Sequence, residues 1–142
     1  MRVALVLLLC CACRTASGPP PPSEGELDVH RRALVVDADS DVTEAVRYEQ
    51  YDLGIAHQDH HEDIPRMRAG GLSAEFLSIF VQPGRFRAEQ FFDEAQTQID
   101  AVRKAVAAHP ADLSLARTAR EVGENARRGR TSILLGDRKS VV

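Results

Sequence analysis

The pattern that most constrains the fold of this 142-residue chain is an alternation of short apolar runs with helix-forming segments. Each run is rich in Val, Ile or Leu and has the length of a buried strand. The runs occupy residues 33–38, 72–81, 113–116 and 131–135. Such repetition predicts an α/β fold in which helices cover a parallel sheet.

The segments between these runs carry helix signals. Residues 87–109 give the clearest one, because apolar residues recur every three or four positions and form one stripe. The stripe consists of Phe91, Ala95, Ile99, Val102 and Val106. Thr118 and Glu121 form a capping box that opens a helix ending before Gly129. Weaker signals predict helical turns in residues 43–51 and 63–69.

The first 30 residues differ in composition from the rest. A positive start followed by a short apolar run indicates a signal peptide over residues 1–12, and the run is too short to span a bilayer. Cleavage there would leave Cys13 at the N-terminus, which resembles a lipidated bacterial lipoprotein. Residues 13–30 include four consecutive prolines and are expected to form a tether. We therefore expect an exported protein of the cell envelope, periplasmic or at the outer surface, attached to the membrane by lipid at Cys13; an ordinary signal peptide is the alternative.

Charge narrows the class of function. The formal net charge of −3 argues against a nucleic-acid binder. Residues 37–63 hold nine Asp or Glu, one Arg and three His, so any chemistry is expected in this segment. No cysteine follows Cys13, which excludes a disulfide, a thiol nucleophile or a cysteine metal site in the body of the protein.

Asp37, Asp39 and Asp41 follow directly on the first apolar run. Alternate residues of an extended chain face the same side about 7 Å apart, and such carboxylates repel each other unless a cation lies among them. Active sites of parallel α/β folds form at the carboxyl ends of strands. A metal ion held by Asp39 and Asp41 is therefore one hypothesis, and a solvated acidic turn is an equally good one on composition alone.

Three blocks of the sequence, in order, resemble the membrane-dipeptidase family (peptidase family M19, renal-dipeptidase-like). They are residues 35–41 with the following Tyr51-Asp52-Leu53, residues 63–78 with the motif Arg68-Ala69-Gly70-Gly71, and residues 131–136. The resemblance implies that residues 31–136 are the N-terminal portion of a metal-dependent-hydrolase (β/α)8 TIM barrel. It also implies hydrolysis of dipeptides at a two-zinc site, with Asp39 and Asp41 as metal ligands.

The sequence departs from the family pattern at two places. Asp39 stands where the family has a histidine ligand. A carboxylate at this position favours harder ions, so manganese is possible as an alternative to zinc. The family's remaining ligands and its acid or base groups lie on later strands, so no catalytic residue is expected here. A complete barrel needs about 250 residues, and we expect a truncated fragment that is inactive alone. Residues 137–142 match the translated start of a common sequencing adapter and are expected to be a non-native tail.

Two alternatives compete with the dipeptidase hypothesis. Asp59-His60-His61 is similar to the tripeptide of DHH-type metal-dependent phosphoesterases, although no glycine follows it. The histidines of this segment, His57 included, are otherwise expected to be ordinary loop residues. The second alternative is a non-catalytic envelope lipoprotein with a solvated acidic surface. Nothing in the sequence indicates an oligomeric state.

Overall fold

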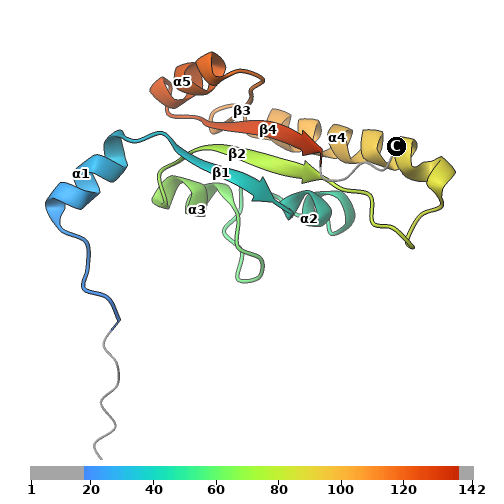
Figure 1. Cartoon of the computed structure of the whole chain (residues 1–142), viewed down its shortest axis with the longest axis horizontal. Helices are drawn as coiled ribbons and strands as arrows, with labels where there is room; N and C mark the ends of the chain where they lie inside the picture. Colours follow the sequence, from blue (N-terminus) through green and yellow to red (C-terminus); the bar gives the residue numbers. More distant parts are fainter. Residues whose placement is uncertain (1–17, 138–142) are drawn as a thin grey trace, which may run out of the picture.

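Four parallel strands form the sheet in the computed structural model, which describes residues 18–137 (Figure 1). The strands are β1 (Val35–Ser40), β2 (Leu72–Ile79), β3 (Leu113–Leu115) and β4 (Thr131–Asp137). Their spatial order is β1-β2-β4-β3, and every pairing is parallel. The predicted strands and the parallel arrangement are therefore confirmed, with small shifts at the ends of the strands.

The helices also lie where the sequence predicts them. They are α2 (Val42–Tyr48), α3 (Ile64–Ala69), α4 (Phe91–Ala108) and α5 (Ala119–Arg127), with a 3-10 turn, η1 (Ala88–Gln90), before α4. The capping box of α5 is present: the Thr118 side chain accepts from the backbone N–H of Glu121, and Glu121 accepts from that of Thr118.

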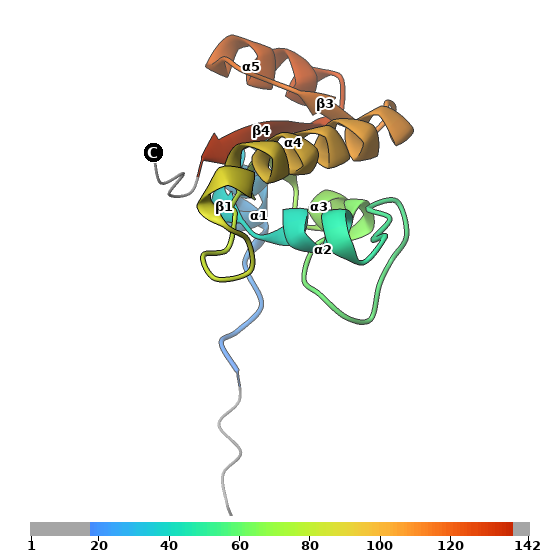
Figure 2. The same ribbon diagram turned by 90° about the vertical axis from the view of Figure 1, so that its right-hand side faces the viewer.

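The main core lies between the sheet and helices α2, α3 and α4, which share one side of the sheet in Figure 2. Leu77 of β2 and Ile133 of β4 are completely buried there against Val102 of α4. A smaller cluster beneath α5 joins Ala74 of β2 to Val122. The two central strands, β2 and β4, thus carry most of the buried apolar surface of the sheet.

The prediction that the first strand is buried is wrong. Only Ser40 at its end is buried, and Val36 remains 49% exposed although its backbone pairs in register with Ala74. The reason is position: β1 lies at the edge of the sheet described here, where a single neighbouring strand covers it. The apolar composition of the run identifies a strand but not its place in the sheet.

The predicted stripe of α4 is only partly correct. Val102 and Val106 are buried, but the first turns of the helix bury Glu94 and Gln98. The Gln98 side chain accepts from the Phe80 backbone N–H at 2.9 Å and donates to its carbonyl at 2.8 Å. Helix α4 is thus attached to the chain just after β2 by polar contacts that apolar periodicity does not reveal.

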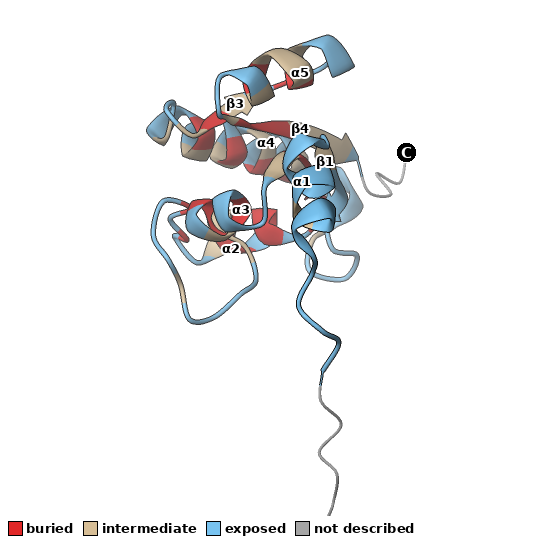
Figure 3. Ribbon diagram, turned by 90° about the vertical axis from the view of Figure 1, so that its left-hand side faces the viewer, coloured by how far each residue is buried: buried red, intermediate tan, exposed pale blue. Residues whose placement is uncertain are grey.

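A further helix, α1 (Glu24–Arg32), lies within residues that we assigned mainly to a tether. Ser23 and Glu26 form a complete capping box at its start. The helix has no buried residue, as its exposed surface in Figure 3 shows, and His30 donates to the Gly70 carbonyl at 2.9 Å. The capping box is the signal that sequence analysis missed.

Between residues 18 and 137, no helix is both long enough and apolar enough to cross a membrane. The predicted signal peptide, Cys13 and residues 138–142 of the predicted tail lie outside the described residues.

Candidate metal site

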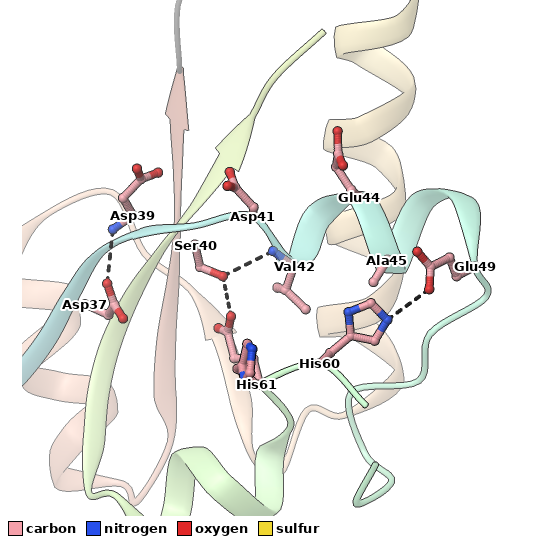
Figure 4. Close-up of a pocket in the computed structure, with 11 residues that line it drawn as sticks. Asp37, Asp39, Ser40, Asp41, Val42, Glu44, Ala45, Glu49, His60 and His61 are labelled. Carbon is pink, nitrogen blue, oxygen red and sulfur yellow. Dashed lines mark hydrogen bonds and ion pairs between the residues drawn. The ribbon is translucent and has the colours of Figure 1, made fainter. Parts of the chain in front are cut away.

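The acidic segment begins where β1 changes its register against β2. Asp37 pairs with Glu75 and Ser40 pairs with Leu77, so that three steps along β1 correspond to two along β2. Such a bulge turns side chains away from the regular alternation of a strand. In Figure 4, Asp39 and Asp41 accordingly point to one side of the chain, and Asp37 points to the other.

Hydrogen bonds fix this turn from β1 into α2. Ser78, buried on β2, donates its hydroxyl to Asp39 Oδ1. The Asp39 backbone N–H donates to Asp37 Oδ1 at 3.2 Å, and the Val42 N–H donates to Ser40 Oγ at 3.2 Å. Asp41 occupies the N-cap position of α2, yet its side chain makes no capping hydrogen bond. The Asp41 side chain therefore does not cap α2 by a hydrogen bond.

A cavity of about 390 Å³ opens beside these residues (Figure 4). Eleven residues from the end of β1, from α2 and from the following loop line it: Asp37, Asp39, Ser40, Asp41, Val42, Glu44, Ala45, Glu49, His60, His61 and Glu62. The structure thus brings both predicted metal ligands, Asp39 and Asp41, to one strongly acidic cavity.

Two histidines of the loop between α2 and α3 contact neighbouring side chains. His57 stacks on the ring of buried Tyr51, with ring centroids 3.8 Å apart. His60 contacts Glu49 through a 2.9 Å hydrogen bond from Nε2, and both His60 and His61 line the acidic cavity. That the histidines of this segment are ordinary loop residues stays a prediction.

One buried carboxyl group of this region, Glu75 on β2, escaped sequence analysis. Glu75 lines a cavity together with half-buried Glu62, which accepts from the Ser40 hydroxyl. Burial, then the hydrogen bond with Glu62 and the negative charges of Glu62 and Asp37, raise the pKa of Glu75 to about 10. The available signal was a single charged residue, Glu75, within the apolar run 72–81.

The donor set fits a divalent cation in kind. Carboxylate oxygens bind zinc, manganese and magnesium, and the two aspartates follow a β-strand at its carboxyl end. Within residues 18–137, however, no three His, Cys, Asp or Glu side chains lie close enough together to hold a metal ion. Asp39 and Asp41 can therefore supply part of a metal site but not all of it.

Comparison with known proteins agrees with the arrangement of the strands and helices. The family model "Membrane dipeptidase (Peptidase family M19)" matches residues 24–138. A comparison with curated proteins finds no match.

The solved structures that resemble this chain agree with the family match. The M19 metallopeptidase dipeptidase AC is 25% identical with a TM-score of 0.62, over 73% of this chain and 34% of its own. The Rhodobacter sphaeroides metallopeptidase, solved with a phosphinate mimic of L-Ala-D-Ala, is 21% identical with a TM-score of 0.65, over 73% of this chain and 37% of its own. The probable dipeptidase PvdM of Pseudomonas aeruginosa is 20% identical with a TM-score of 0.64, over 80% and 30%.

The chain thus spans about a third of the length of these structures. Neither the family match nor the structures support the phosphoesterase alternative. The chain belongs to the membrane dipeptidase family, peptidase family M19, and its α/β sheet corresponds to part of the TIM-barrel-like fold of that family.

Proposed function

We propose that this segment contributes two metal ligands, Asp39 and Asp41, to a metal-dependent dipeptidase. The observation that carries the proposal is that a chain of the M19 family directs both carboxylates to one side at the carboxyl end of β1 (Figure 4). This is the end of a parallel strand at which α/β barrels place their chemistry.

The chemistry follows from the charges. A bound divalent cation would polarise a peptide carbonyl and a water molecule, which is the catalytic contribution of metal ions in hydrolases. Asp39 and Asp41 would bind it, and Ser78 would hold Asp39 in a fixed orientation through its hydroxyl. The family resemblance points to zinc, and the carboxylate of Asp39 in place of a histidine favours a harder ion, so zinc or manganese is the proposed ion.

Metal binding is the first test. Because Asp39 and Asp41 supply only part of a site, we expect the full chain to bind Mn²⁺ weakly, which is measured by the loss of the free-ion signal in electron paramagnetic resonance. Replacing Asp39→Asn or Asp41→Asn should weaken binding by at least about tenfold. The matched control is Asp59→Asn, an exposed aspartate of the same acidic segment that does not line the cavity. Equal binding by all four proteins would refute the metal site.

Turnover is the second test, and it uses a chimaera. Residues 24–137 would replace the structurally matched segment of the Rhodobacter sphaeroides enzyme, whose ligand mimics L-Ala-D-Ala. We propose dipeptides as the substrate class, so the chimaera should hydrolyse L-Ala-D-Ala with added zinc or manganese. Activity should fall by about 100-fold or more with Asp41→Ala and stay within about twofold with Asp59→Asn. A folded chimaera without activity would count against the dipeptidase assignment.

We also propose that the protein is exported and attached to the envelope membrane by lipid at Cys13. The support is the sequence of the first thirteen residues together with the family's membrane association. A clickable palmitate analogue should label the expressed full chain and should not label Cys13→Ser. Labelling of both proteins to the same extent would refute acylation at this residue.

A further inference from the structure

Glu75 is a buried acid in the middle of the sheet. Its side chain is 1% exposed, and its backbone pairs with Asp37 on one side and with Ile133 on the other. Placing an ionised carboxylate in such a position is very unfavourable unless a cation or several donors surround it. The question is therefore which group compensates for the burial of the Glu75 carboxyl group.

The charged groups around Glu75 do not supply a cation to it. Glu75 lines a cavity of about 280 Å³ whose other titratable or charged members are Asp37, His61, Glu62 and Arg66. The Arg66 guanidinium is directed elsewhere: it donates to the His60 carbonyl at 3.0 Å and lies 3.4 Å from Asp63. Glu75 Oε2 and Glu62 Oε1 are buried atoms that no donor among residues 18–137 reaches.

The closest chemical partner of Glu75 is another carboxyl group. Glu62 lines the same cavity as Glu75, and each of the two has a buried side-chain oxygen that no donor among the described residues reaches. Two carboxylates accept hydrogen bonds and donate none, so a hydrogen bond between them requires a proton on one of them. Glu75 is the more deeply buried of the two, and burial disfavours the charged form, so the proton is assigned to Glu75.

We propose that Glu75 keeps its proton in the folded protein and donates it to Glu62, and that this pair positions the turn between Asp39 and Asp41 through Ser40. With this hydrogen bond the path is continuous, because Glu62 accepts from the Ser40 hydroxyl and Ser40 accepts from the Val42 N–H that opens α2. Glu75 is thus a positioning residue. The positional role rests on the proposed function, whereas the shared proton does not.

Infrared spectroscopy of the full chain tests the shared proton directly. Near pH 7 the wild-type protein should show the C=O stretch of a protonated carboxyl group, since ordinary carboxyl groups are ionised there. Glu75→Gln should abolish the band. Glu89→Gln, which changes an exposed glutamate paired with Arg87, should retain it. Absence of the band from the wild-type protein, or its persistence in Glu75→Gln, would overturn the proposal.

Urea unfolding as a function of pH gives an independent readout. A group whose pKa is raised on folding stabilises the protein fully below its unfolded value of 4.5, and this stabilisation is lost as the pH rises towards 10. The wild-type urea midpoint should therefore fall between about pH 5 and about pH 9, and Glu75→Gln should remove this part of the slope. An unchanged slope in Glu75→Gln would overturn the proposal.

Mn²⁺ binding tests the positional role. Glutamine keeps a donor towards Glu62 and leucine does not, so Glu75→Gln should retain wild-type affinity while Glu75→Leu loses about tenfold. Equal affinity of the two variants would overturn the positional role. A wild-type protein that binds no Mn²⁺ but shows the carboxyl band would refute the metal site and leave the shared proton in place.

Discussion

The carboxyl end of β1 and the pair β2–β4 belong to the same sheet but are built in opposite ways. β2 and β4 pair residue for residue over six positions and bury Leu77 and Ile133 completely. β1 shifts register twice against β2, exposes Val36, contains Asp37 and Asp39 and is followed by Asp41. The regular pair buries apolar side chains of the core. The irregular strand gathers acidic side chains at its carboxyl end, which is typical of a functional segment.

The largest difference between the two regions should be in the loss of stability when an apolar side chain is shortened. Leu77→Ala removes a fully buried side chain of β2 and should lower the free energy of unfolding by about 2–5 kcal/mol. Val36→Ala on β1 should change it by less than about 0.5 kcal/mol, because half of this side chain is exposed. Urea unfolding of both variants measures the difference. Similar losses would mean that β1 contributes as much to the core as β2.

The next largest difference in stability is expected between substitutions of a buried aspartate and those of exposed aspartates. Asp63 is completely buried at the start of α3 and accepts from the backbone N–H groups of Arg66 and His57, at 2.9 and 3.1 Å. Asp63→Ala leaves both donors unpaired and should cost about 1–3 kcal/mol. Asp39→Asn and Asp41→Asn should cost less than about 0.5 kcal/mol. A cost at Asp39 equal to that at Asp63 would assign the β1 aspartates to the fold.

The pH dependence of unfolding tests the contribution of buried Asp63 to stability in a second way. Burial on its own would raise the pKa of Asp63, but the N–H groups of Arg66 and His57 and the Arg66 charge lower it below 3.8. Asp63 therefore stabilises the protein above pH 3.8, and this contribution is lost as the pH falls through the folded pKa. Asp63→Asn should flatten the acid limb of a plot of urea midpoint against pH. An unchanged acid limb would contradict this account.

The smallest difference in stability is expected between substitutions at two helix N-cap positions. Thr118 caps α5 with its side chain, and Thr118→Ala should cost about 1 kcal/mol. Asp41 has the corresponding position at α2 but makes no capping hydrogen bond, so Asp41→Ala should be close to neutral for stability. Thermal unfolding of the two variants side by side tests this. A large loss at Asp41 would show that it caps the helix after all.

Local patterns in the sequence were sufficient for the strands, for helices α2 to α5 and for the parallel sheet, but helix α1 was missed. The apolar runs and the box at Thr118 are short-range signals, and the structure confirms them. These local patterns could not predict the exposure of β1, because exposure depends on which strands lie beside β1. Glu62 and Glu75, from a loop and from β2, line one cavity, and buried Gln98 bonds to the Phe80 backbone. Such properties arise from tertiary pairing, which periodicity along one segment does not encode.

At the candidate site, residue types were predictable but geometry was not. The position of Asp39 and Asp41 after an apolar run is visible in the sequence. The register shift that directs both carboxylates to one side depends on pairing with β2, as does the contact between Asp39 and Ser78. Whether the pair holds a metal ion remains a prediction.

The direction in which the chain enters the sheet has a consequence for access. Helix α1 leads into the start of β1, and the aspartates follow its far end, roughly 20 Å away for six extended residues (Figure 1). Helix α1 therefore lies at the amino ends of the strands. Small solutes would reach the acidic cavity at the opposite end of the sheet, away from the helix through which the chain enters it.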